Sequence, residues 1–287
     1  MNKIIPIGQF LPYTLSDLSV VIPQASQYVN RIKWFIPQYI KMTPPEVIKN
    51  TIVVYDPEDE ETRKVLEQYD IKGITVTPPH STYKQEAGFN HVKTRLCARV
   101  HNDSLFIRSD WAETLIEKFN QTPTSTSLST SNPQLIGAFN ISGGIDKERL
   151  DKLVSWYPCF KPIYDNLAFS EAEAPTTGAP FLSAGFMASQ TYVWRGIYPL
   201  VVEFNEGKMD KEDVITTLLF SVIGVIITSW LNMYSFVKDA GGGYGDFDEG
   251  FTPLGEQFMV TSENKANFTK GEYQTVLSKA EFKEVVS

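Results

Sequence analysis

The chain has 287 residues, of which 42% are hydrophobic, so it is long and apolar enough to bury a substantial core as one large α/β domain or two small ones. Asp and Glu total 34 against 26 for Lys and Arg, which gives a net charge of -8. Because the basic residues are scattered along the chain, we expect no surface for nucleic acid.

The N-terminal segment and the cysteines indicate the compartment. Pro6, Gly8 and Pro12 interrupt the first residues before an apolar core of signal-peptide length forms. Cys97 and Cys159 lack the spacing of a metal site, and Cys97 lies in an apolar strand, which favours a buried, reduced thiol. We therefore expect a cytoplasmic protein.

The first eighty residues alternate predicted strands and helices. Residues 18–23 and 51–55 are unbroken apolar runs typical of buried parallel strands, and residues 73–76 form a third, shorter strand. Residues 28–42 have a hydrophobic face at helical spacing, and a charged helix follows Asp56. This order predicts right-handed βαβ units in a parallel sheet, with a nucleotide at the carboxyl ends of the strands.

The next predicted strand, residues 96–101, runs into the polar sequence His101-Asn102-Asp103. Predicted helices flank it at residues 86–93 and 111–119. A carboxylate at the end of such a strand is a candidate ligand for Mn²⁺ or Mg²⁺, which prefer oxygen donors, and His101 or Asn102 would add a ligand or a hydrogen bond. The alternative is that Asp103 caps the following turn.

The second half of the chain contains long loops between fewer regular elements. We expect loops at residues 121–133 and 168–180, a strand at 135–141, a helix at 150–156, a glycine-rich loop at 241–250 and a terminal helix or tail at 269–286. These features predict one domain over residues 1–260, with one half at about 15–120 and a second half at about 134–260. Residues 261–287 would form the C-terminal helix or tail.

Residues 214–237 carry no charge, and the length alone would suit a membrane-spanning helix. Gly224 and several polar residues interrupt the segment, so we predict a buried helix to about Ile223, a stop, and a buried strand. A transmembrane helix is the alternative. Glu212 and Asp213 precede the segment, and they would either cap its positive end or include a general base.

Taken in order, these features resemble the GT-A glycosyltransferases, particularly the inverting, family-2-like enzymes. The matching segments are the opening strand Val20-Val21-Ile22-Pro23, the acidic Asp56 after the second strand, the motif His101-Asn102-Asp103, the segment Ser183-Ala184-Gly185-Phe186 with Trp194-Arg195 after it, and the pair Glu212-Asp213. The resemblance covers residues 18–236. His101 stands where the family has its first acidic residue, so the metal site implied here has one carboxylate where the family has two.

The resemblance implies a fold and a role for each matching residue. The fold would be a GT-A, Rossmann-like three-layer α/β sandwich with a mostly parallel central sheet. Its nucleotide-binding half would be at about 15–120 and its acceptor-binding half at about 134–260. The donor nucleotide would contact Pro23, Asp56, Lys93, Arg95 and Asn102. Asp103, with His101, would bind Mn²⁺ or Mg²⁺. The sugar and the acceptor would contact Gly185, Phe186 and Trp194. Asp213 would be the catalytic base, and Glu212 would assist acceptor binding.

The expected function is transfer of a sugar from a nucleotide-diphosphate donor, such as a UDP-sugar, to a hydroxyl of a glycan or glycoconjugate, with inversion. Peripheral membrane contact is compatible with this function. The alternatives are a retaining transferase, a nucleotidyltransferase, and an inactive carbohydrate-binding protein on the same fold. For single residues the plain alternatives are that Arg95 is a surface cation and that Phe186 and Trp194 fill the core.

Overall fold

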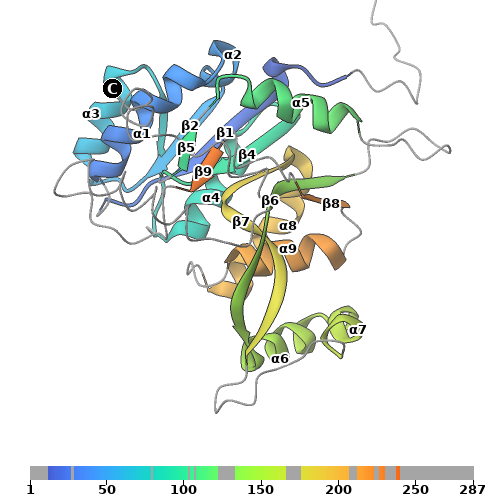
Figure 1. The fold of residues 1–287 in the computed structure, drawn as a ribbon. Coiled ribbons are helices and arrows are strands. Elements are labelled where there is room, and N and C mark those ends of the chain that lie inside the picture. The colour runs from blue at the N-terminus through green and yellow to red at the C-terminus, as the bar shows by residue number, and fades with distance from the viewer. Residues whose placement is uncertain are drawn as a thin grey trace, which may run out of the picture.

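The computed structural model describes residues 12–26, 29–78, 80–102, 104–106, 108–121, 133–165, 176–206, 212–222, 226–229 and 237–239. A seven-stranded sheet with the order β3-β2-β1-β4-β7-β6-β8 forms its centre (Figure 1). Its strands are β1 (Leu18–Pro23), β2 (Thr51–Tyr55), β3 (Lys72–Thr75), β4 (Leu96–Val100), β6 (Gln134–Asp146), β7 (Thr176–Gln190) and β8 (Ile226–Ser229). Strands β5 (Ser104–Phe106) and β9 (Val237–Asp239) form a separate antiparallel pair.

Strand direction follows the predicted pattern in the first half of the chain. Strand β1 pairs in parallel with β2 and β4, and β2 pairs in parallel with β3. Strand β7 is antiparallel to both of its neighbours, β4 and β6, while β6 and β8 are parallel. The predicted α/β fold with a mostly parallel central sheet is therefore confirmed.

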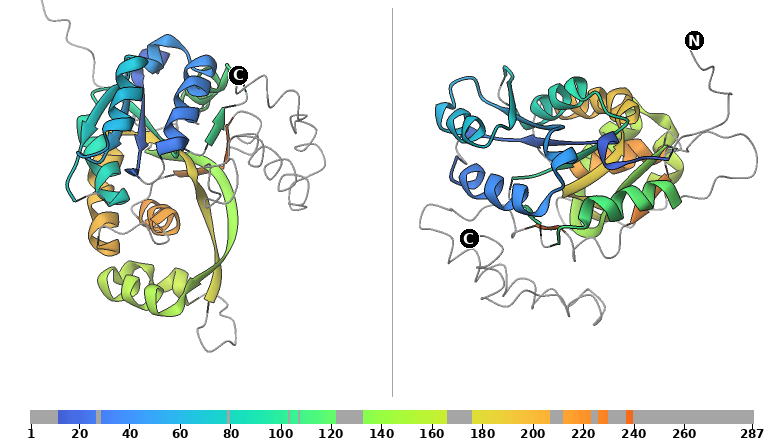
Figure 2. Two further views of the ribbon diagram at one scale, coloured as in Figure 1. Left: turned by 90° about the vertical axis from the view of Figure 1, so that its left-hand side faces the viewer. Right: turned by 90° about the horizontal axis from the view of Figure 1, so that it is seen from above.

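Helices cover both faces of the sheet, which makes three layers. The helices are α1 (Val29–Met42), α2 (Pro45–Ile48), α3 (Glu60–Gln68), α4 (Ser81–His91), α5 (Trp111–Gln121), α6 (Lys147–Trp156), α7 (Lys161–Tyr164), α8 (Thr191–Asn205) and α9 (Glu212–Val222). Helices α1, α2, α3 and α5 contribute to one hydrophobic core, and α4, α6, α8 and α9 contribute to the other. The right-hand view of Figure 2 shows α1 and α5 on one side of the sheet and α4 and α8 on the other.

Strands β1, β2 and β4 are buried on both faces because helices lie above and below them. This explains why their sequences are continuous apolar runs instead of alternating ones. Cys97 is buried in β4, as predicted. Helix α1 packs against one face through residues at helical spacing, with Pro37 inside the helix. The buried residues of α1 in this core are Ile32, Phe35, Ile36 and Tyr39.

Helix α4 lies close to the sheet because Gly88 has no side chain. A Cβ at Gly88 would lie 2.3 Å from Cγ1 of Val21 and 3.1 Å from Cγ2 of Val54, which are both strand residues. The close approach brings the first turns of α4 over the carboxyl ends of β1 and β2, where the functional site is built.

Several predicted elements differ from those in the structure. The helix expected at 86–93 spans Ser81–His91, and the loop expected at 168–180 overlaps β7, which begins at Thr176. Within residues 214–237, α9 ends at Val222 and strand β8 follows, so the helix-then-strand prediction is confirmed. No helix in the described ranges combines the length and the apolar character that crossing a bilayer requires. Residues 241–250 and 261–287 lie outside the described residues, as does most of the loop predicted at 121–133.

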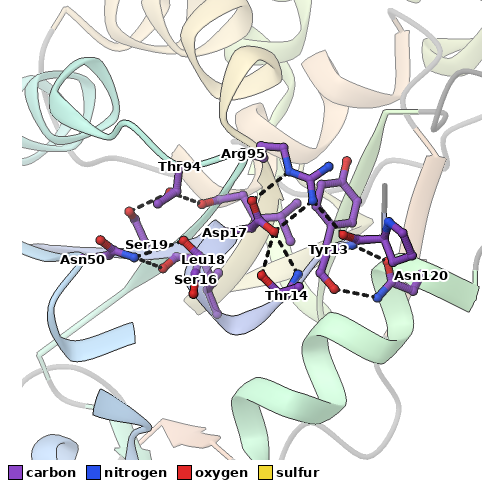
Figure 3. A network of polar contacts seen from close by, with 12 residues as sticks. Tyr13, Thr14, Ser16, Asp17, Leu18, Ser19, Asn50, Thr94, Arg95 and Asn120 are labelled. Atoms are coloured by element: carbon purple, nitrogen blue, oxygen red, sulfur yellow. Dashed lines mark hydrogen bonds and ion pairs between the residues drawn. The ribbon is translucent and has the colours of Figure 1, made fainter. Parts of the chain in front are cut away.

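The amino ends of the parallel strands are held to the N-terminal segment by Arg95, which directly precedes β4 (Figure 3). Its Nε and Nη2 donate to the two carboxylate oxygens of Asp17 at 2.8 and 2.9 Å, and its guanidinium lies 4.4 Å from the ring centre of Tyr13. The main-chain N–H and C=O of Tyr13 both bond to the side chain of Asn120 in α5, at 2.8 and 3.0 Å. This network, far from the carboxyl ends of the strands, is structural.

Replacement of Asp17 tests the contribution of this network to stability. The Arg95 guanidinium lowers the pKa of Asp17 from 3.8 to about 2. A lowered pKa means that the stabilisation is present above the unfolded value and is lost as the pH falls toward about 2. We expect Asp17→Asn to lower the free energy of unfolding by about 1 kcal/mol at neutral pH, since solvent screens this partly exposed pair.

The measurement is urea unfolding between pH 7 and pH 3, with Asp165→Asn as the matched control. Asp165 forms an ion pair with Lys161 in which both side chains are more than half exposed, so its replacement should change little. A difference between parent and Asp17→Asn that did not shrink with falling pH would contradict the assignment.

Candidate functional site

The candidate site lies at the carboxyl ends of β1, β2 and β4. Gln24 follows β1, Asp56 follows β2, and His101 and Asn102 follow β4. The carboxyl ends of parallel strands meet at one edge of the sheet, which brings these side chains together. The amide nitrogen of Asn102 donates to Oε1 of Gln24, so the segments after β1 and β4 are in direct contact.

Lys84, in helix α4, also reaches this edge of the sheet. Its Nζ lies 2.5 Å from Oδ1 of Asp56 and donates to the carbonyl of Gln24 at 2.7 Å. The other oxygen of Asp56, Oδ2, accepts from the main-chain N–H of Ser26 at 2.9 Å. Both charged side chains are almost fully buried, so each charge depends on the other for compensation.

The turn after β4 is fixed by its main chain. The N–H of His101 donates to the carbonyl of Gly185 in β7 at 3.2 Å, and the N–H of Ser104 donates to the carbonyl of His101 at 3.1 Å. The Ser104 hydroxyl also donates to the Gly185 carbonyl, at 2.9 Å. Gly185 therefore contributes to the site through its backbone. Asp103, the predicted metal ligand in this turn, lies outside the described residues.

A buried polar network connects β4 with the start of α9. Nη1 of Arg99 lies 2.9 Å from Oε1 of Glu212 and donates to Oε1 of Gln85 at 2.9 Å. The second carboxylate oxygen of Glu212 accepts from Nε2 of Gln85 at 2.9 Å and from the Tyr198 hydroxyl at 3.3 Å. Nε2 of His101 lies 3.7 Å from Oε1 of Glu212. The turn after β4 and the first residue of α9 therefore meet at one place.

The two acids at the start of α9 differ in environment. Burial acts to raise the pKa of Glu212, but the positive charge of Arg99, together with the contributions of His101 and Gln85, outweighs burial, so the pKa is lowered and the carboxylate is ionised at neutral pH. Asp213 is only partly buried, and burial raises its pKa above the ordinary value. Its Oδ1 accepts from the N–H of Val214 at 2.9 Å. Glu212 is buried, and its carboxylate is bonded to Arg99, Gln85 and Tyr198. The expectation that it binds the acceptor is therefore corrected.

Two aromatic residues expected to contact sugar are core residues. Phe186 is fully buried, with its ring 5.9 Å from that of Trp111 in an edge-to-face arrangement. Trp194 is also fully buried, stacks on Phe89 at 4.6 Å, and donates from Nε1 to the carbonyl of Cys97 at 2.9 Å. Burial of their large apolar area explains this placement, and the assignment of both to a sugar site is corrected.

The residues expected to bind the donor nucleotide fall into two groups. Pro23, Asp56 and Asn102 lie at the carboxyl edge. Arg95 and the exposed Lys93 precede β4 and lie at its amino end, so the structure does not bring them to the site. Lys84 is a cation that does reach the carboxyl edge. Sequence reasoning missed it because the buried face of α4 contains Thr82, Lys84 and Gln85, which show no hydrophobic periodicity.

A divalent metal needs side-chain ligands that lie close together. Among the described residues no three His, Cys, Asp or Glu side chains come together as ligands of an ion. His101 faces Glu212, but that carboxylate already accepts from Arg99, whose positive charge opposes a cation there. Asp103, the residue expected to bind the metal with His101, lies outside the described residues, so the metal site stays a prediction.

Comparisons with known proteins bear on the fold. No protein-family model and no curated protein matches the chain. Among solved structures, it is similar to galactosyltransferase LgtC in complex with donor and acceptor sugar analogs, at 15% identity over 91% of this chain and 85% of that one, with a TM-score of 0.46. It is similar to glucosyl-3-phosphoglycerate synthase from Mycobacterium tuberculosis in complex with Mg²⁺ and uridine diphosphate, at 12% identity, 76% and 73% coverage and a TM-score of 0.43. It is also similar to 4-diphosphocytidyl-2C-methyl-D-erythritol synthase from Anaerococcus prevotii, at 13% identity, 74% and 86% coverage and a TM-score of 0.42. At these values the likeness concerns the α/β arrangement alone.

Proposed function

We propose that the chain is a glycosyltransferase that moves one sugar from a nucleotide-diphosphate donor to a hydroxyl of a glycan or glycoconjugate, with inversion. The observation that carries this proposal is the meeting of the turn after β4 with the start of α9. His101 Nε2 lies 3.7 Å from Oε1 of Glu212, although the two residues are far apart in the sequence. A transferase needs its donor-binding turn and its base close together, and this contact supports the proposal because Glu212 directly precedes Asp213. The cytoplasmic location expected from the sequence is part of the proposal.

The donor side of the proposed site is the carboxyl edge formed by Gln24, Asp56, Lys84 and Asn102. These side chains come from four segments and carry both hydrogen-bond donors and acceptors. Because these side chains are almost fully buried and bonded to one another, their proposed role is to shape and support the edge against which the nucleoside of the donor would lie. Pro23, at the end of β1, borders it.

In the proposed reaction, Asp213 is the general base. The acceptor oxygen attacks the anomeric carbon, the bond from that carbon to the diphosphate oxygen breaks, and the diphosphate leaves with the bonding electrons. The acceptor proton passes to the Asp213 carboxylate. The raised pKa of Asp213 supports this role, because it makes the carboxylate a stronger proton acceptor. A divalent cation at Asp103 remains a prediction, and no step described above depends on it.

The second candidate is an inactive carbohydrate-binding protein on the same fold, which His101 favours because it stands where related transferases have an acidic residue. Two measurements separate the candidates. Thermal shifts with a panel of nucleotide sugars, with and without Mn²⁺, should reveal a stabilising donor, because a ligand selective for the native state raises apparent stability. That donor should then release nucleoside diphosphate, and the anomeric configuration of the product should be inverted. Donor binding without any release of nucleotide would overturn the enzymatic proposal.

Replacement of Asp103 tests the metal prediction. We expect Asp103→Ala to weaken donor binding about 10- to 100-fold in the presence of Mn²⁺, since Asp103 would no longer hold a cation that offsets the charge of the donor diphosphate. Titration calorimetry of the donor with and without Mn²⁺ measures the effect, and Asp165→Ala, at an exposed position, is the control. An unchanged donor affinity in Asp103→Ala would remove the metal from the proposal.

A further inference from the structure

We propose that Arg99 is a positioning residue of this site, which holds Glu212 and thereby fixes the start of α9 and the Asp213 carboxylate. The inference rests on the proposed function in one respect, since it takes Asp213 as the base. The inference adds Arg99 to the proposed site. The sequence patterns did not single out this residue, because the other residues of its strand are apolar.

The placement of Arg99 is costly for a protein unless its charge is matched. Arg99 lies in the central strand β4 and is fully buried, as is Lys84 nearby in the same half of the fold. A buried guanidinium requires a counter-charge and hydrogen-bond acceptors. Glu212 supplies the charge, Gln85 supplies an acceptor, and Sδ of Met187 lies 3.4 Å from Nη2.

The same contacts restrict where α9 begins. Glu212 is the first residue of α9, and its carboxylate is bound by side chains from β4, α4 and α8. A helix whose first residue is held on three sides has little freedom to shift at that end. Asp213 is the next residue, so its carboxylate takes its position from this anchor. Arg99 is the charged member of this anchor, and its Nη1 donates both to Glu212 and to Gln85, while Nη2 faces Met187.

The experiment compares variants that separate positioning from stability. Arg99→Met alone leaves the Glu212 charge buried without its partner, so the double variant Arg99→Met/Glu212→Gln is used as well, because it removes both charges and retains a folded core. Arg99→Lys keeps the positive charge but replaces the guanidinium with an ammonium group. The matched control is Arg195→Met, which removes a guanidinium that donates to carbonyls at the other end of α4, including Phe89 at 2.9 Å and Asn90 at 3.2 Å.

We expect the double variant to keep cooperative unfolding and a donor KM within about twofold of the parent, while kcat falls about 10- to 100-fold, because displacement of a reacting group by about 1 Å has such an effect. Arg99→Lys should restore part of kcat, and Arg195→Met should leave kcat unchanged. A folded double variant with the parent kcat would overturn the role of Arg99 and leave the proposed function standing. Full activity of Asp213→Asn, measured alongside, would instead overturn the proposed base and this inference with it.

Discussion

Asp213→Asn is expected to lower kcat for sugar transfer by at least about 100-fold while leaving donor affinity within about twofold. The amide is similar in size to the carboxylate but cannot take up the acceptor proton. Its carbonyl oxygen still accepts from the N–H of Val214, as Oδ1 of Asp213 does at 2.9 Å, so the start of α9 is preserved. Steady-state rates with saturating donor, together with donor titration calorimetry, measure the two effects separately.

The pH dependence of sugar transfer gives a second measurement of the role of Asp213. A base is active only when deprotonated, so transfer should be lost as the pH falls through the pKa of Asp213, which burial raises. The acidic limb of the rate profile should therefore lie above that of an exposed aspartate and should be absent from residual Asp213→Asn activity. Asp165→Asn, which changes an exposed acid, should retain both the parent rate and its profile. Parent-like transfer by Asp213→Asn would reject the base assignment.

Lys84→Met is expected to lower the free energy of unfolding by about 3–5 kcal/mol. It leaves Asp56 as a buried anion without the Nζ that lies 2.5 Å from its Oδ1, and it leaves the Gln24 carbonyl without its Lys84 donor. The cost of an uncompensated buried charge exceeds that of the lost contacts themselves. Denaturant unfolding at neutral pH, followed by circular dichroism, measures the difference.

Two further variants identify the cause of that loss. Lys84→Met/Asp56→Asn removes both charges and should recover most of the lost stability. Lys161→Met breaks an ion pair of the same types on the surface and should cost less than about 1 kcal/mol, because solvent already screens it. If Lys84→Met cost no more than Lys161→Met, the Asp56 charge would not depend on Lys84 in solution.

The sequence predicted the parallel half of the sheet and the polar residues that follow its strands. Strands β1, β2 and β4 are buried on both faces, so their order and extent appear directly as apolar runs. The polar residues that follow them, such as Asp56 and His101, necessarily lie at one edge once the strands are parallel. The interruption of residues 214–237 by a glycine likewise predicted a helix followed by a strand, which α9 and β8 confirm.

The sequence did not predict β7. Its residues, TTGAPFLSAGFMASQ, include Gly, Pro, Ala and Ser and have neither an apolar run nor an alternation. The strand is held by antiparallel pairing with β4 and β6, its neighbours on both sides. Such pairing depends on the partners that the rest of the chain provides, and a local pattern contains no information about them.

The roles of individual residues likewise depend partly on local sequence and partly on tertiary contacts. An apolar run must be buried away from water, and alternation of such runs with helices predicts parallel strands. The sequence alone therefore determined which edge of the sheet the strands end at and which acids follow them. Tertiary contacts alone decided that Lys84 pairs with Asp56, that Arg99 holds Glu212, that Arg95 binds Asp17 at the opposite end, and that Phe186 and Trp194 fill the core. The partners of each charged side chain lie on other helices and strands, and only the folded chain brings those elements together.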